Sequence, residues 1–126
     1  MNIHKIISGF FFILAMTLNF GFFYGDPTSI EQHSAYELFF VVIVNLIATF
    51  LKLGDKTQLG AVLLATSLVA DLQLISSAII WTVTLYGTQH FTVTTSVTIV
   101  SLSGGALLAN IVSVVLFIGD TIKSKR

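Results

Sequence analysis

One carboxylate lies deep inside a long apolar stretch of this chain, with amide and hydroxyl side chains near its expected depth. The carboxylate is Asp71, and Asn45 and Asn110 lie within two other apolar stretches. At 1.5 Å of helix rise per residue, these three residues fall within about 6 Å of one depth in a membrane. Ser67 and Gln73 flank the same level. The five residues predict a polar site inside the membrane, because a charge at that depth costs about 2.5–3.5 kcal/mol and needs partners or water.

Two kinds of chemistry fit this predicted site. In one, the carboxylate and amide oxygens bind a cation or relay a proton. In the other, Asp71 is protonated, and the polar groups hold the helices together through hydrogen bonds of about 0.6 kcal/mol each. The sequence places no lysine or arginine at the expected depth of Asp71. An ionic partner for Asp71 would therefore have to come from another subunit.

The sequence indicates no catalytic or metal-binding constellation. The chain has no cysteine, which excludes a thiolate metal site and a cysteine nucleophile. His4 is expected on the opposite side of the membrane from His33 and His90, so the histidines predict no shared metal site. No hydroxyl lies in a context that would activate it as a nucleophile. We therefore expect a non-catalytic protein without metal or cofactor.

Composition identifies the solvent in which these residues must be positioned. The 126 residues are 55% hydrophobic and 10% charged, where a soluble domain carries about 25% charged residues. Mean hydropathy is +0.94. The net charge of zero gives no basic surface for nucleic acid, so the lipid bilayer is the expected partner.

The apolar stretches predict an all-α, polytopic membrane protein with four transmembrane helices in a single domain, residues 1–126. The first stretch has about 19 residues, enough to cross a bilayer, and no small-residue cleavage pattern follows it, so we expect an uncleaved span rather than a signal peptide. The predicted spans are residues 6–24, 36–53, 59–86 and 91–118.

The basic residues predict the orientation of these spans. Four spans place all six lysines and arginines on one side of the membrane, and Asp26, Glu31 and Glu37 on the other. Cytoplasmic loops are enriched in lysine and arginine. The pattern therefore predicts a multi-pass protein of a bacterial inner membrane, with both termini in the cytoplasm.

A polar turn separates the second and third spans. It reads Gly54, Asp55, Lys56 and Thr57. Gly54 suits the left-handed residue that often ends a helix, and either Asp55 or Thr57 can cap the next helix. Lys52 precedes the turn, so Lys52 and Lys56 are expected to bracket it.

The second and fourth spans resemble each other at a separation of 65 residues. Asn45 then corresponds to Asn110, and Gly54-Asp55 to Gly119-Asp120. A genuine duplication would give two parallel helical-hairpin repeats related by an axis along the membrane normal. Two apolar helices that end at the same interface would also show such a likeness by chance.

The fourth span carries small residues at every fourth position. Such a stripe allows another helix to approach closely. The contact could lie within this chain or with a second subunit. The stripe consists of Ser101, Gly105, Ala109 and Ser113.

The turn also resembles a known transporter signature. Gly54-Asp55-Lys56-Thr57-Gln58 is similar to part of the Glu-x-Gly-Asp-Lys-Thr/Ser motif of Gdt-type manganese/calcium–proton exchangers, with Lys52 at the position of the glutamate. That resemblance implies cation exchange. Over nearly its full length, including residues 65–71, the chain resembles an uncharacterised family of short bacterial four-span integral membrane proteins, which implies no particular activity.

Two functions follow from these features. The first is a non-catalytic small inner-membrane protein, a helical bundle that self-associates or serves as an accessory subunit of a membrane complex for ion transport. The alternative is a minimal homo-oligomeric conductor of cations or protons that uses Asp71. The lysine in place of glutamate favours the first, and the deep carboxylate favours the second.

Overall fold

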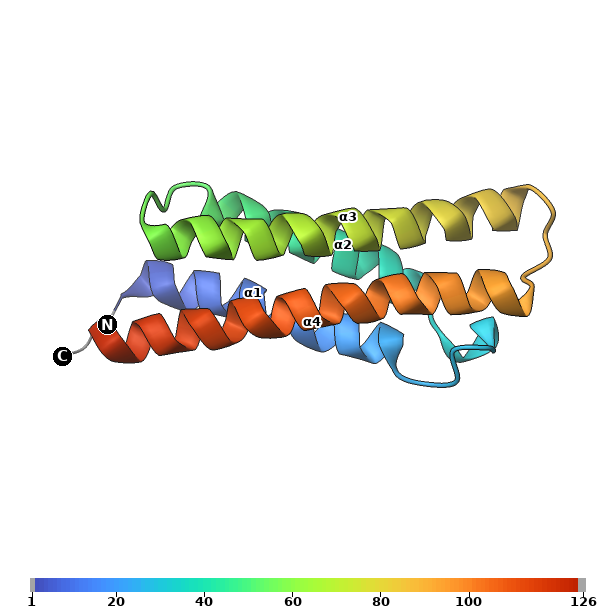
Figure 1. Ribbon diagram of the computed structural model, residues 1–126, viewed down its shortest axis with the longest axis horizontal. Coiled ribbons are helices and arrows are strands. Elements are labelled where there is room, and N and C mark those ends of the chain that lie inside the picture. Colours follow the sequence, from blue (N-terminus) through green and yellow to red (C-terminus); the bar gives the residue numbers. More distant parts are fainter. Residues whose placement is uncertain (1, 125–126) are drawn as a thin grey trace.

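Four long helices run along the molecule in the computed structural model, which describes residues 2–124 (Figure 1). Within these residues there is no strand, which confirms the all-helical prediction. Each of the four is long and apolar enough to cross a membrane. The helices are α1 (Ile3–Phe23), α2 (Ala35–Lys52), α3 (Gln58–Tyr86) and α4 (Val93–Ser124), and a short 3-10 turn, η1 (Ile30–Gln32), lies between α1 and α2.

Side-chain caps fix where three of the helices begin. The side chains of Asn2, Ser34 and Thr57 accept hydrogen bonds from the first free backbone N–H groups of α1, α2 and α3. The prediction of a cap at Asp55 or Thr57 is therefore confirmed for Thr57. Asp55 holds the capping residue in place, because its carboxylate accepts hydrogen bonds from the backbone N–H and the hydroxyl of Thr57, at 2.9 and 2.6 Å.

The prediction of a left-handed Gly54 is wrong. Leu53 ends α2 in right-handed helical geometry, and its N–H donates to the carbonyl of Phe50. The N–H of Asp55 then bonds to the carbonyl of Lys52. Because these tight turns satisfy the end of α2, no left-handed residue is needed; among the described glycines the positive φ belongs to Gly25.

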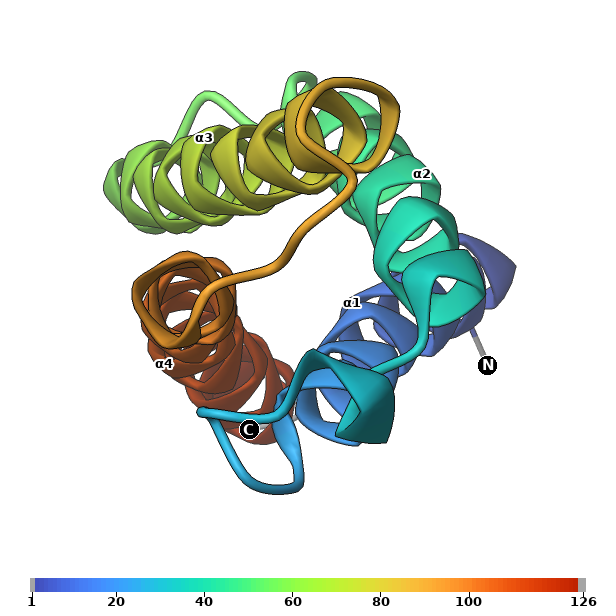
Figure 2. The same ribbon diagram turned by 90° about the vertical axis from the view of Figure 1, so that its right-hand side faces the viewer.

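The helices form a closed ring, seen end-on in Figure 2. Each contacts its two neighbours: α1 with α2, α2 with α3, α3 with α4, and α4 with α1. Both termini lie at the same end of the bundle, together with the turn between α2 and α3 (Figure 1). We call this the termini end. The opposite end, with the 24–34 loop and the turn between α3 and α4, is the far end.

Buried residues recur at alternating steps of three and four along every helix. This is the heptad spacing of bundles whose helices cross at a small angle. The buried positions that follow this spacing are Ser8, Phe12, Ala15, Asn19 and Phe22 on α1; Leu38, Val41, Asn45, Ala48 and Lys52 on α2; Gly60, Leu63, Ser67, Ala70, Leu74, Ser77 and Trp81 on α3; and Ser96, Ile99, Ser103, Ala106, Asn110 and Ser113 on α4. Other buried residues lie next to this series, namely Gly9, Val44, Asp71, Ala78, Val100, Leu107 and Val114.

The core differs between the two halves of the bundle. Towards the far end it is an apolar cluster that includes Phe22, Leu38, Leu74, Trp81 and Ile99. Towards the termini end, a smaller apolar cluster of Phe12, Ala48 and Val114 lies beside the buried side chain of Lys52. The buried lysine thus lies in the half of the bundle next to the termini.

The two Gly-Asp pairs of the suspected repeat have different local structures. Gly54-Asp55 lies in the turn between α2 and α3, whereas Gly119-Asp120 lies within the last turns of α4. Both aspartates nevertheless reach the termini end, because α2 and α4 run in the same direction. The two Gly-Asp pairs thus lie at the same end of the bundle, but their backbone conformations differ.

Candidate intramembrane polar site

Lys52 is the central cation of the buried polar site. It ends α2, but its side chain turns into the bundle and is 4% exposed. The ammonium donates hydrogen bonds to Ser67 Oγ of α3 and Ser113 Oγ of α4, both at 2.6 Å. It also lies 4.5 Å from the centre of the Phe12 ring of α1, within range of a cation–π contact. One side chain therefore ties all four helices together.

Asp71 lies on the same side of α3 as Ser67, one turn further from the termini. Its side chain is 7% exposed, and its Oδ2 accepts a hydrogen bond from the hydroxyl of Thr49 on α2. The same hydroxyl oxygen lies 2.9 Å from the backbone carbonyl oxygen of Asn45, so its one hydrogen is shared between the two acceptors. The other carboxylate oxygen, Oδ1, is buried and has no hydrogen-bond partner among the described residues.

The structure brings a basic group near Asp71 that the sequence did not predict, because the Lys52 ammonium bonds to Ser67, one helical turn from Asp71. The charges of Lys52 and Asp71 interact, although no direct ion pair joins them in the described part of the chain. A lysine side chain is long enough to carry its charge well away from its own backbone. Lys52 uses that length to point inward, so the chain supplies its own counter-charge to Asp71.

Asn110 belongs to a separate hydrogen-bonded pair. Its amide Nδ2 donates to Asn19 Oδ1 at 3.0 Å, and Asn19 Nδ2 donates to the backbone carbonyl of Ser103 at 2.8 Å. Asn19 is fully buried. This pair joins α1 to α4, across the bundle from the contact between Asp71 and Thr49.

Asn45 and Gln73 do not bond to the other predicted site residues. Asn45 donates to the carbonyl of Val41 on its own helix, and its Oδ1 is buried without a partner. Gln73 lies on another face of α3, where its amide covers Gly105 of α4. The structure thus divides the five predicted residues: Ser67 and Asp71 lie around Lys52, Asn110 pairs with Asn19, and Asn45 and Gln73 stand apart.

The small-residue stripe of α4 serves contacts within this chain. A side chain at Gly105 would collide with the Gln73 amide of α3, Ala109 packs against the apolar core, and Ser113 accepts from Lys52. Ser101 is exposed. Of the two possibilities left open by the sequence, the internal contact accounts for three of the four positions.

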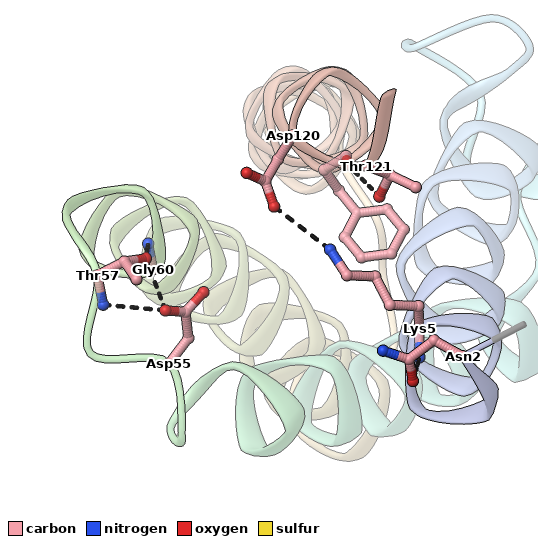
Figure 3. Close-up of polar contacts among 8 residues, drawn as sticks. Asn2, Lys5, Asp55, Thr57, Gly60, Asp120 and Thr121 are labelled. Atoms are coloured by element: carbon pink, nitrogen blue, oxygen red, sulfur yellow. Dashed lines mark hydrogen bonds and ion pairs between the residues drawn. The ribbon is translucent and has the colours of Figure 1, made fainter. Parts of the chain in front are cut away.

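A cavity of about 100 Å³ opens at the termini end, below Lys52. Its lining includes Lys5, Lys52, Asp55 and Asp120. Figure 3 shows Lys5 of α1 reaching across to Asp120, with 3.3 Å between Nζ and Oδ2. Asp55 turns to its own loop, where the hydroxyl and N–H of Thr57 hold the pKa of the Asp55 carboxyl below its ordinary value.

This arrangement fits an internal clamp better than a cation pathway. The Lys52 ammonium is held at Ser67, one helical turn from Asp71, where its charge would repel a mobile cation. The apolar cluster fills the core between this site and the far end. The Gdt-type motif fits this interpretation, because Asp55 and Thr57 act in a helix cap and Lys52 replaces the glutamate.

Sequence reasoning missed Lys52, Asn19 and Thr49 as members of the site. The heptad spacing could have identified Lys52 and Asn19. Lys52 continues the series of buried positions on α2, and Asn19 belongs to the series of buried positions on α1. Thr49 lies outside these series, and only the packing of α2 against α3 identifies it. His33, for which the sequence predicted no metal site, is buried as well.

Comparison with known proteins gives one match. The sequence profile of a family of unknown function matches residues 32–121, from the end of η1 to the last turns of α4. This range contains Lys52, Asp71 and the turn between α2 and α3. No curated protein matches the chain, and no solved structure does. The resemblance to an uncharacterised membrane family thus has support, whereas the resemblance to Gdt-type exchangers has none.

Proposed function

Since this match covers well over half of the chain, the protein belongs to DUF6394, a family of unknown function, and we propose that it is a non-catalytic membrane subunit that associates with a second copy of itself. Such a pair would stand alone or serve as an accessory part of a larger complex, for which ion transport is our working hypothesis. We place the protein in a bacterial inner membrane with both termini in the cytoplasm. In support, the lysines of the described residues lie at or near the termini end, and Asp26, Glu31 and Glu37 at the far end.

Gln73 carries the proposal of self-association. Its amide lies in a shallow groove between α3 and α4 that is lined mostly by apolar and small residues, among them Val69, Gly105 and Ala109. Its Oε1 has no hydrogen-bond partner among the described residues. Lipid tails offer no donor, so an amide at this depth gains from a polar partner on another helix.

A second copy of the same groove supplies that partner. In a pair related by a two-fold axis, each residue near the axis meets its own counterpart. Two Gln73 amides can then each donate and accept, because an amide carries both kinds of group. The last torsion angle of a glutamine side chain takes a broad range of values. Either the oxygen or the nitrogen of the amide can therefore turn towards the groove at little cost in energy.

Disulfide crosslinking in native membranes tests this pairing. The chain has no cysteine, so an introduced cysteine is unique. Val69→Cys lies in the groove and should form a covalent dimer under mild oxidation, and adding Gln73→Leu should reduce the yield several-fold. Ile43→Cys is similarly exposed on α2 and serves as the control. Equal crosslinking at both positions, or none at Val69→Cys, would refute association through this groove.

A second candidate function is conduction of protons or cations through Asp71. The observation that favours it is the buried and unpartnered Asp71 Oδ1, next to Thr49. Flux into proteoliposomes distinguishes the two functions. Conduction requires a flux that Asp71→Asn abolishes without loss of assembly. The subunit function predicts no flux above that of empty liposomes for either protein.

A further inference from the structure

His33 sits at the far end of the bundle, between η1 and α2. The side chain is 6% exposed. Its Nδ1 lies 2.6 Å from the backbone carbonyl oxygen of Phe22, at the end of α1, and its Nε2 lies 2.9 Å from the carbonyl oxygen of Asp26 in the following loop. The ring thus bridges the two ends of the 24–34 loop from within.

The chemistry of this bridge depends on protonation. A carbonyl oxygen only accepts hydrogen bonds, and a neutral imidazole carries a single N–H, whereas the imidazolium carries two. Both contacts can therefore be hydrogen bonds only when the ring is cationic. We propose that protonated His33 is a latch that closes the 24–34 loop over the far end of the bundle and releases it when the ring loses its proton.

The charges around His33 suit a cation. The described charged side chains in the 24–34 loop are acidic: Asp26, whose carboxylate accepts from Thr28, and Glu31, which accepts from Ser29. The N–H and hydroxyl of Thr28, and after them the charge of His33, hold the pKa of Asp26 below its ordinary value.

The neighbouring helices add one acidic group near the loop and no basic one. On α2, the Glu37 carboxylate lies against Gly21 of α1. α3 contributes the Trp81 ring, which contacts Phe22. α4 contributes Ser96, whose hydroxyl donates to the carbonyl of Pro27 at 2.9 Å. No described lysine lies at this end of the bundle, and the other histidine there, His90, is exposed in the turn between α3 and α4. Within the 24–34 loop, the His33 imidazolium is therefore the cation that can offset the acidic groups.

Deprotonation would weaken the loop where it covers the apolar core. The Phe22 ring lies 5.5 Å from the His33 ring and 6.1 Å from Trp81. A neutral ring would keep one hydrogen bond and turn a bare nitrogen towards the other carbonyl. Both carbonyl oxygens are satisfied only by the charged ring, so the closed loop favours low pH, and closure weakens as the pH rises. Ser96 then remains as the anchor of the loop to α4.

Two measurements on the full-length protein in nanodiscs test the latch. The first is ¹⁵N NMR of the imidazole nitrogens in a protein carrying His4→Gln and His90→Gln, which leaves His33 as the one histidine. At about pH 5.5, on the acidic side of an ordinary histidine, both ring nitrogens should carry hydrogen. A neutral tautomer at that pH with the loop still closed would overturn the proposal.

The second measurement is hydrogen exchange of the loop amides, corrected for the intrinsic effect of pH. Protection should fall by roughly tenfold or more between about pH 5.5 and pH 8.5, the effect of one lost charge-assisted hydrogen bond. His33→Gln should show the same protection at both pH values. His90→Gln removes the exposed histidine of the other far-end turn and should keep the pH dependence. Equal protection of the unmodified protein at both pH values would refute the latch, and neither measurement depends on self-association.

Discussion

Replacing Lys52 by methionine tests whether the buried cation stabilises the bundle. Methionine keeps the length of the side chain and its packing against Phe12, but removes the ammonium. Ser67 and Ser113 lose a donor, which a serine in a helix can tolerate by bonding to its own backbone. The larger effect falls on Asp71, which is left as a buried charge without a counter-charge.

The expected magnitude follows from the kind of interaction that is lost. Removing one partner of a buried ion pair lowers the free energy of unfolding by about 3–5 kcal/mol. A neutral hydrogen bond between membrane helices contributes about 0.6 kcal/mol on average. Lys52 and Asp71 interact without direct contact, so we expect Lys52→Met to lower the free energy of unfolding by about 3 kcal/mol, the low end of that range. Asp71→Asn should cost less and leave insertion and assembly intact. An amide retains the bond to Thr49, and Lys52 keeps both hydroxyls and the Phe12 ring.

A double-mutant cycle isolates the interaction between the two charges. The two single variants and the double variant are unfolded by titration with SDS in mixed micelles, and the single tryptophan, Trp81, reports the transition by fluorescence. The double variant should be more stable than Lys52→Met alone, with a coupling energy well above about 0.6 kcal/mol. If the coupling is no larger than that, or if Lys52→Met unfolds like the unmodified protein, the two residues do not form a charge-compensated clamp.

Three further predictions concern the rest of the bundle. Gly105→Leu should insert normally but lower the unfolding stability by about 1–3 kcal/mol, because it forces the Gln73 amide away from α4; a stability equal to that of the unmodified protein would show that α3 and α4 can separate freely. Lys5→Ala should change stability by less than about 1 kcal/mol and remove part of its salt dependence, since the bond to Asp120 is partly exposed; a large loss in the same SDS titration would contradict this. Asp55→Ala should lower stability by about 1 kcal/mol through the start of α3. The Asp55 carboxyl has a lowered pKa in the folded protein, so its contribution is present above about pH 4 and is lost on acidification, and the variant should lack that part of the acid sensitivity.

The sequence by itself determined the class of the protein and its four helices. Hydropathy and length depend on composition over some 20 residues, so they identify a membrane-crossing helix without knowledge of its neighbours. The cap at Thr57 was also predictable, because its bond to Gly60 spans three residues of chain. Even the burial of Lys52 was within reach, since it continues the heptad series of α2.

Only the tertiary structure decided which polar groups meet. Asn45, Asp71 and Asn110 have similar expected depths, but depth does not specify which way each side chain faces around its helix. The packing of the ring brings Asp71 to Thr49 and Asn110 to Asn19, and directs Lys52 inward between two serines. The same holds for His33, whose two carbonyl partners come from the end of α1 and the following loop. The direction of a side chain and the identity of its partners depend on contacts between distant segments, which local sequence patterns do not encode.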